Sequence, residues 1–215
     1  MEDLQRLFDN NKRFAQEILR TDPDFFKRRT DKQEPHFLFI GCADSRVPIE
    51  MLTGVAPGEM FVHRNIANQV IPADLNILSV LHYAVEVLNV KHVIVCGHLQ
   101  CGGIQAAMSD ASFGLVDHWL AGVRELVRHH QAELDALPDH QSRANRLVEL
   151  NVLRQVHQLS RTPIVQDAWK RGRRPLLHGL VYDIKDGLLR QLVVGVDGVE
   201  RARALLAHDQ HRVEY

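Results

Sequence analysis

The sequence has only three cysteines among its 215 residues, which is too few for a framework of disulfide bonds. It also lacks any run close to the roughly 20 consecutive apolar residues that a membrane-spanning helix needs. Residues 1–20 mix charged and apolar side chains, so they do not resemble a secretory signal peptide. We therefore expect a cytoplasmic protein without a membrane partner, whose cysteines serve as metal ligands, catalysts or core residues.

An excess of positive charge is absent as well, because 26 Lys and Arg residues are balanced by 27 Asp and Glu residues. The one dense basic run, "KRGRR" at 170–174, is short and follows a predicted helix, so we interpret it as a solvated helix end or an intersubunit contact. Nucleic acid is therefore not expected as a partner. The length and the hydrophobic fraction of 45% instead predict one globular domain, residues 1–215, with a sizeable core.

Apolar runs and helical periodicities alternate along the chain. The runs predict buried strands at 36–42, 59–66 and 91–98, with a long helix at 73–89 between the last two. Strands that alternate with helices imply right-handed crossovers and a parallel sheet. Two further strands, 176–183 and 188–195, flank the turn "IKDG" and predict a hairpin that places an antiparallel strand at the sheet edge.

The remaining segments are predicted to be helical. Residues 101 to about 172 are mostly helical, with a start signal at Thr162 and Pro163, and a last helix closes the chain. Apolar residues near helical spacing within 1–20 predict an amphipathic N-terminal helix that packs on its own domain or on a partner subunit. The expected fold class is α/β, with a mainly parallel central sheet, an antiparallel edge hairpin, flanking helices and an N-terminal helical arm.

The stretch "GCADSRVP", residues 41–48, places a thiol, a carboxylate and a guanidinium at alternate positions directly after a buried strand. In an extended chain, alternate side chains point to the same face, so Cys42, Asp44 and Arg46 are predicted to share one face. A strand end with a buried cysteine and a surface ion pair would give the same pattern.

A second stretch, "CGHLQCGG" at 96–103, places His98 and Cys101 just past the end of another predicted strand. Sites in parallel sheets form beyond the carboxyl ends of strands, so these residues and Cys42 can converge on one point. Zinc accepts thiolate, imidazole and carboxylate ligands in a tetrahedron. The sequence therefore predicts a metal held by Cys42, His98 and Cys101, with Asp44 as the fourth ligand or as a gate. Cys96, inside the run "VIVC", is predicted to be a buried core residue.

The two motifs resemble the C-x-D-x-R and H-x-x-C signatures of β-class carbonic anhydrases, and the chain is similar to members of the bacterial type. The resemblance continues through "GEMFVHRNIAN", "DLNILSVLHYAV", "AWKRG" and "HGLVYDIKDGLLR". It implies one zinc ion per subunit, bound by Cys42, His98 and Cys101, in a dimer or tetramer in which the helical arm, residues 1–30, packs on a partner subunit.

The resemblance also implies an activity, which is the reversible hydration of carbon dioxide to bicarbonate and a proton by a zinc-bound hydroxide. Asp44 is expected to switch between the zinc and Arg46, leaving the fourth position to water in the active state. The residues implied to contact substrate are Gln33, Val47, Phe61, Ile66 and Tyr83, with backbone N–H groups at Gly102 and Gly103 available to an oxyanion.

Some members of this family carry a non-catalytic bicarbonate site, whose counterpart here consists of Phe39, Arg64 and Tyr182. Phe39 stands where those members have tryptophan, and its ring lacks the indole N–H donor, which weakens the expectation. Core packing is the alternative for Phe61, Ile66 and Tyr83, and support of the sheet is the alternative for Arg64.

Three other functions are compatible with parts of the pattern. A related zinc hydrolase acting on CS₂ or COS would use the same metal chemistry. A zinc-stabilised binding module would have a closed site and no activity. Cysteine-based phosphatase or sulfurtransferase chemistry needs a thiolate in a loop of backbone amides, and the glycine-rich loop that would supply it is absent between Cys42 and Arg46.

Overall fold

The computed structural model describes residues 1–172 and 175–208. The end of the basic run at 170–174 therefore lies outside the described residues. The chain divides into two units, Met1–Glu34 and Pro35–Tyr215, and each is described by itself. The predicted arm, residues 1–30, falls within the first unit.

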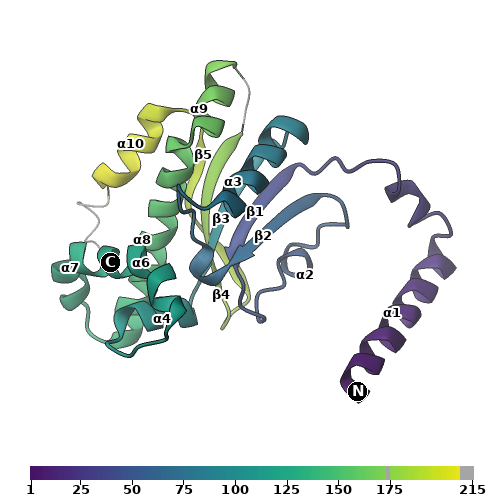
Figure 1. The fold of residues 1–215 in the computed structure, drawn as a ribbon, viewed down its shortest axis with the longest axis horizontal. Helices are drawn as coiled ribbons and strands as arrows, with labels where there is room; N and C mark the ends of the chain where they lie inside the picture. Colours follow the sequence, from purple (N-terminus) through teal and green to yellow (C-terminus); the bar gives the residue numbers. More distant parts are fainter. Residues whose placement is uncertain (173–174, 209–215) are drawn as a thin grey trace. The chain divides into compact units, whose positions relative to one another are not determined.

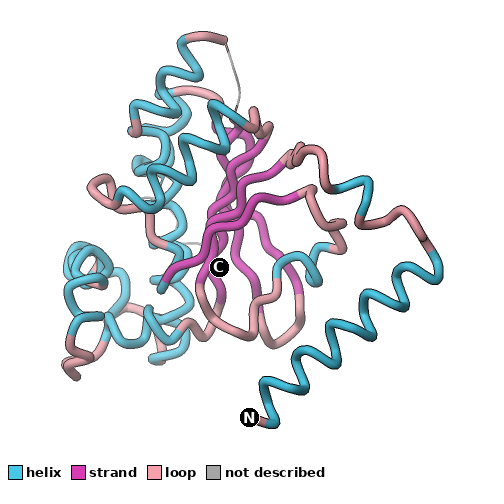
Figure 2. Tube along the Cα trace, turned by 45° about the vertical axis from the view of Figure 1, so that its right-hand side comes forward, coloured by secondary structure: helices cyan, strands magenta, loops and turns pink. Residues whose placement is uncertain are grey.

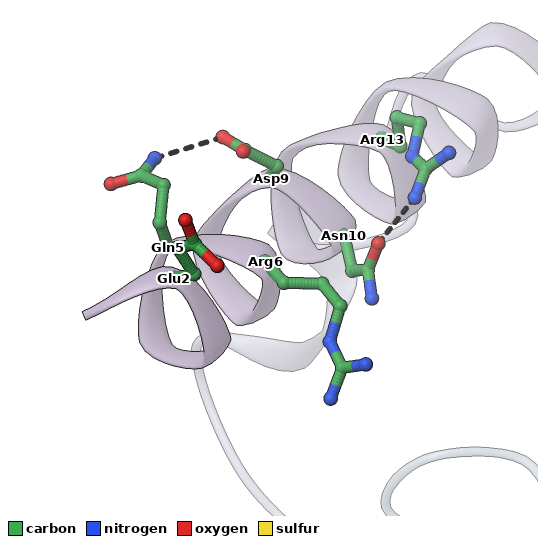
Figure 3. Close-up of a pocket in the computed structure, with 6 residues that line it drawn as sticks. All are labelled: Glu2, Gln5, Arg6, Asp9, Asn10 and Arg13. Atoms are coloured by element: carbon green, nitrogen blue, oxygen red, sulfur yellow. Dashed lines mark hydrogen bonds between the residues drawn. The ribbon is translucent and has the colours of Figure 1, made fainter.

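The first unit consists mainly of helix α1, Glu2–Thr21, followed by a 3-10 turn at Lys27–Arg29. One side of α1 is polar (Figure 3), and along it the amide of Gln5 donates to the Asp9 carboxylate at 3.1 Å. The other side carries large apolar side chains that are exposed in this single chain, namely Leu4, Leu7, Phe8, Phe14 and Leu19. None of the residues of α1 is buried within the described chain.

The second unit is built on a five-stranded sheet with the strand order β2-β1-β3-β4-β5. Its strands are β1 (Phe37–Cys42), β2 (Met60–Asn65), β3 (His92–His98), β4 (Leu176–Asp183) and β5 (Leu188–Val196). The first four strands in space run parallel, and β5 pairs antiparallel with β4 at one edge. The predicted parallel sheet with an antiparallel edge hairpin is therefore confirmed.

Helices connect the strands and cover the sheet (Figures 1 and 2). They are α2 (Ile49–Thr53), α3 (Leu75–His82), α4 (Gly102–Met108), α5 (Leu115–Trp119), α6 (Ala121–His129), α7 (Gln131–Asp135), α8 (His140–Arg161), α9 (Pro163–Lys170) and α10 (Val199–His208). A π-helical turn, Tyr83–Val87, prolongs α3. The predicted start of α9 is confirmed, because Thr162 caps the helix by accepting the N–H of Val165 and Pro163 occupies the first turn.

The core lies mainly between the sheet and α8, which runs along one face of it (Figure 1). A Cβ atom at Gly97 would lie 2.7 Å from the Cγ2 of Val152, so the absence of a side chain there lets α8 approach β3 closely. A smaller apolar cluster on the opposite side includes Phe39, Val47 and Ile49 of α2. Within the described residues, no helix has both the length and the apolar character needed to cross a bilayer.

Candidate metal centre

Three side chains with metal-ligand chemistry converge at one edge of the sheet. Cys42 is the last residue of β1 and His98 is the last residue of β3, its parallel neighbour, so both strands end at the same edge. Cys101 follows through a turn in which Gln100 adopts a φ of 60°, and it caps the N-terminus of α4. The predicted convergence of the two motifs is confirmed, since the Cys42 and Cys101 sulfurs lie 3.8 Å apart.

The donor atoms of Cys42, His98 and Cys101 all lie within 4.8 Å of one another, and all three residues are buried. Two sulfurs bound at about 2.3 Å to a tetrahedral zinc ion are about 3.8 Å apart, which matches the observed separation. The Nδ1 of His98 lies 3.0 Å from the carbonyl oxygen of Leu99, which places the ring proton on Nδ1. Its Nε2 is buried without a hydrogen-bond partner among the described residues. This donor set fits a zinc ion.

The two cysteines share one negative charge before any metal binds. The hydrogen bond from Cys101 lowers the pKa of the Cys42 thiol to about 4. The same hydrogen bond, together with burial, raises the pKa of the Cys101 thiol well above its usual value. Because a metal needs both sulfurs as thiolates, its binding displaces the remaining proton from Cys101.

The backbone near both sulfurs also affects their pKa values. Backbone groups of Ala67 and Asp44 help to lower the pKa of the Cys42 thiol, and backbone groups of Gly103 and Ile104 oppose the rise in the pKa of the Cys101 thiol. Both effects favour the thiolate form. A Cβ atom at Gly103 would lie 2.9 Å from the Cγ2 of Ile66, so the close packing of this turn requires glycine.

Asp44 and Arg46 form a turn beside the cysteines, and β1 has already ended at Cys42. The extended alternation that the sequence suggested for 42–46 is therefore wrong. The Asp44 Oδ1 instead accepts the backbone N–H of Arg46 at 2.9 Å, and the Asp44 carbonyl accepts the N–H of Val47 at 3.2 Å. This turn arises because an aspartate side chain readily accepts a hydrogen bond from the backbone two residues ahead.

The turn brings the Asp44 carboxylate between a guanidinium and an imidazole. Its two oxygens accept hydrogen bonds from Nε and Nη2 of Arg46 at 2.9 and 2.7 Å. Its Oδ2 also lies 3.6 Å from the Nε2 of His98. Hydrogen bonds from Arg46 hold the pKa of the Asp44 carboxyl well below its usual range, so the group is ionised.

Arg64 contacts the backbone of the same segment. Its Nε donates to the carbonyl of Cys42 at 2.9 Å and its Nη2 donates to the carbonyl of Asp44 at 2.6 Å. Phe39 and Tyr182, the other residues of the predicted bicarbonate site, lie together in the smaller apolar cluster. The guanidinium of Arg64 therefore links β2 to the loop that carries Cys42 and Asp44.

The residues predicted to contact substrate lie in different surroundings. Phe61 and Tyr83 face each other with ring centroids 5.9 Å apart, and Ile66 contacts the turn at Gly103. Ile66 and Tyr83 are 39% and 43% exposed, so core packing does not explain them in this chain. Val47 is buried in the smaller apolar cluster. Gln33 belongs to the N-terminal unit, which is described apart from this centre.

Cys96 is buried in the smaller apolar cluster, as predicted, and burial raises its pKa to about 12, so it stays a thiol. The sequence did not indicate the carbonyl of Gln100, which accepts a hydrogen bond from Arg46 Nη2 at 3.2 Å. This contact comes from the backbone, which leaves no residue-type signal in a single sequence.

Comparison with known proteins agrees with this site. The carbonic anhydrase family model matches residues 37–189. A carbonic anhydrase of Emericella nidulans is 43% identical over 90% of this chain and 85% of its own length. A bacterial carbonic anhydrase, from Pseudomonas aeruginosa, is 36% identical over 95% of this chain and 92% of its own. The similarity is thus shared by fungal and bacterial enzymes.

A solved structure supports the same assignment. One of two tetrameric β-carbonic anhydrases from the ascomycete Sordaria macrospora superimposes with a TM-score of 0.87 at 37% identity, covering 91% of this chain and 100% of that chain. The fold, the cysteine–histidine–cysteine cluster and these matches agree with one another. The chain belongs to the β-class carbonic anhydrase family and is a carbonic anhydrase.

Proposed function

We propose that this carbonic anhydrase holds one zinc ion per chain on Cys42, His98 and Cys101, and that Asp44 moves between the metal and Arg46. The observation that supports it is the buried Nε2 of His98, which has no hydrogen-bond partner in the part of the chain that the structure describes and lies next to two sulfurs 3.8 Å apart. Zinc would supply Lewis acidity, which makes a water molecule nucleophilic near neutral pH. Attack of this water molecule on carbon dioxide would give bicarbonate and a proton.

Asp44 and Arg46 act as a unit in this proposal. Two thiolates already cancel the charge of Zn²⁺, so a carboxylate ligand would make the centre anionic. Arg46 competes with the metal for the Asp44 carboxylate, because a guanidinium binds a carboxylate through two hydrogen bonds and stays charged. The Asp44 carboxylate is paired with Arg46 and lies 3.6 Å from His98 Nε2. It is therefore close enough to the metal centre to move between the metal and Arg46.

With Arg46 holding it, the Asp44 carboxylate has a second role. Its oxygens are acceptors, so Oδ2 can take a hydrogen bond from the attacking water and orient a lone pair of that water toward the carbon of carbon dioxide. Deep depression of the pKa of Asp44 keeps the carboxylate in the accepting form throughout the physiological range.

Carbon dioxide is small and apolar, and we propose that Phe61, Ile66 and Tyr83 provide apolar surface for it, with Val47, Gln33 and the N–H groups at Gly102 and Gly103 as further contacts. The exposure of Ile66 and Tyr83 leaves room for substrate or for a second subunit beside them. The exposed apolar side of α1 also favours self-association. A related enzyme of S. macrospora is tetrameric, and we propose a dimer or tetramer here, with the arm on a partner subunit.

A regulatory bicarbonate site at Phe39, Arg64 and Tyr182 remains part of the proposal. Bicarbonate would accept hydrogen bonds from the guanidinium of Arg64. In doing so it would compete with the carbonyl oxygens of Cys42 and Asp44, which accept from Arg64 in this structure. Such competition would connect bicarbonate concentration to the position of the loop that carries Asp44.

The test combines zinc analysis with stopped-flow carbon dioxide hydration across pH, for the wild type and for Asp44→Asn. Asparagine keeps the shape but loses the charge, so zinc should remain near one per chain while turnover falls sharply. Asp183→Asn is the matched control, because Asp183 also accepts a backbone N–H two residues ahead and pairs with an arginine, on the β4–β5 hairpin. Full activity of Asp44→Asn would refute the role of the pair, and absence of zinc from the wild type would refute the metal site.

A further inference from the structure

A cavity lies within the second unit, where the C-terminal end of α8 meets α9 and α10. Both of these helices pack against α8 (Figure 1). The cavity has a volume of about 310 Å³, and none of the residues that line it belongs to the metal centre. Binding sites for small molecules have volumes of about 300–1,000 Å³, so a ligand of this cavity would be small.

The ionisable side chains that line this cavity are all basic. His157 and Arg161 are one turn apart on α8, so they lie on the same face of that helix, and Arg203 lines the cavity from α10. Aspartate and glutamate are absent from the described residues of the lining. Within residues 1–172 and 175–208, neither arginine makes an ion pair or a side-chain hydrogen bond. Two guanidinium groups and an imidazole therefore share one cavity without a carboxylate to balance them.

The neutral polar side chains of the lining already have partners in the protein. Ser160 is buried, and its hydroxyl donates to the carbonyl of His157 at 2.7 Å. The amide of Gln166, in α9, donates to the carbonyl of Ser160 at 3.3 Å. Val199 and Ala202 of α10 add an apolar side. The groups that remain to bind a ligand are therefore the two arginines and the histidine.

The protonation of His157 is consistent with a ligand of negative charge. Burial lowers the pKa of His157, and the guanidinium of Arg161 lowers it further. An anion bound beside both groups would oppose the effect of Arg161, because a nearby negative charge favours the charged form of an imidazole. Binding of an anion should therefore raise the pKa of His157.

We propose that this cavity binds a phosphate group, as the free ion or as a phosphate monoester, through Arg161 and Arg203 with His157 as a third donor. Guanidinium groups bind phosphate oxygens through paired hydrogen bonds. A phosphate monoester carries a charge of about −1.5 to −2 at pH 7, which matches two arginines, whereas bicarbonate carries a single charge. The bound group would join α8 to α10 and stabilise the folded chain. This site is independent of the metal site proposed above.

The test measures binding of inorganic phosphate to the zinc-loaded protein. Isothermal titration calorimetry gives the affinity, and the ring resonances of His157 in NMR spectra recorded across pH give its pKa. Saturating phosphate should raise the pKa of His157, and potassium chloride at the same ionic strength should leave it unchanged. A second series with glycerol phosphate distinguishes the two sources of the group, since tighter binding of the ester would show that the apolar side contacts the ligand.

Arg161→Gln and Arg203→Gln each remove one charge and keep a hydrogen-bonding side chain. Each should weaken phosphate binding by about 10- to 100-fold, as expected for the loss of hydrogen bonds to a charged group, and abolish the phosphate-dependent change at His157. Both arginines are exposed, so the variants should fold as the wild type does. Arg128→Gln, at an exposed arginine of α6, is the matched control and should bind phosphate like the wild type. Carbon dioxide hydration without phosphate should be the same in all three variants.

Three results would overturn the proposal. Absence of phosphate binding in the wild type would refute the site directly. Wild-type affinity in both Arg161→Gln and Arg203→Gln would show that phosphate binds elsewhere, for example at the metal centre. An equal loss of affinity in Arg128→Gln would show that the response depends on the overall charge of the protein and not on this cavity. The proposed metal site stands or falls separately, because it is tested by zinc content.

Discussion

Arg46 lies outside Asp44 and holds it from the solvent side. The side chain of Arg46 is 51% exposed and that of Asp44 is 14% exposed, with Nη2 and Oδ2 2.7 Å apart. A further hydrogen bond from Nη2 to the carbonyl of Gln100 connects Arg46 to the loop between His98 and Cys101. The guanidinium therefore contacts both the turn after Cys42 and the loop between His98 and Cys101.

Replacing Arg46 with glutamine should release Asp44 toward the metal, because the charged two-point contact is lost while much of the side-chain volume remains. A hydrogen bond to a charged group contributes about 1.5–3 kcal/mol, so we expect carbon dioxide hydration at neutral pH to fall by about 10- to 100-fold. Zinc content should stay unchanged. Arg190→Gln, which removes the partner of Asp183, is the control and should keep full turnover. Wild-type turnover in Arg46→Gln would contradict the proposed gate.

The adjacent glycines at the start of α4 should respond differently to alanine. At Gly103 the new methyl group would lie 2.9 Å from Ile66 Cγ2 and 3.2 Å from Ala67 Cβ, whereas at Gly102 it would meet open space. Overpacking typically costs about 1–3 kcal/mol, so Gly103→Ala should lower the free energy of unfolding by that amount and weaken zinc binding. Gly102→Ala should leave both unchanged. Chemical denaturation and zinc competition with a chelator measure the two effects, and equal behaviour of the two variants would contradict this packing.

Much of the fold follows from local patterns in the sequence. The buried strands β1 and β3 are continuous apolar runs, and their alternation with helices predicts the parallel sheet and hence the meeting of Cys42 and His98. The metal ligands were predictable because few residue types bind zinc and two motifs contained them. The resemblance to the family then assigned roles that the spacing alone left open.

Other parts of the site could not be predicted from the residues. Asp44 and Arg46 do meet, but in a turn, because the local hydrogen bond from the Arg46 N–H to Asp44 outweighs strand extension after Cys42. Ala67 has a φ of 60°, and the carbonyls of Ile66 and Ala67 accept hydrogen bonds from Trp119 of α5 and Asn151 of α8, which lie 53 and 84 residues away in the chain. Long-range contacts of this kind have no signature in the local sequence.

The variant Arg64→Ala distinguishes two roles of Arg64, which are support of the loop that carries Asp44 and regulation of activity by bicarbonate. Loss of the guanidinium removes the donors to the carbonyls of Cys42 and Asp44, so turnover should fall in every condition. If bicarbonate acts at this site, the variant should also lose the dependence of its activity on added bicarbonate at fixed pH and ionic strength. Stopped-flow assays with and without bicarbonate give both quantities. Bicarbonate and pH dependences that match those of the wild type would refute the regulatory site and leave Arg64 as a support of the loop.

A pair of histidines on β3 and β4 should make stability depend on pH. His178 accepts the N–H of Gly195 at its Nδ1 and lies 3.0 Å from His92 Nδ1 through its Nε2, an arrangement that requires the neutral ring. Burial, with a contribution from His92, lowers the pKa of His178. The unfolded chain then binds a proton at higher pH than the folded chain does, so stability is fully present above about pH 6.5 and falls as the pH decreases below it.

His178→Asn tests this dependence, because the asparagine oxygen can still accept the Gly195 N–H but has no proton to gain in this range. The variant should lose less stability than the wild type between pH 7.5 and 5.5, which are about one unit on either side of the ordinary histidine pKa. Urea denaturation at a series of pH values measures the difference. The exposed His140 on α8 provides the control, and His140→Asn should follow the wild-type curve. Parallel curves for His178→Asn and the wild type would show that the histidine pair does not couple folding to protons.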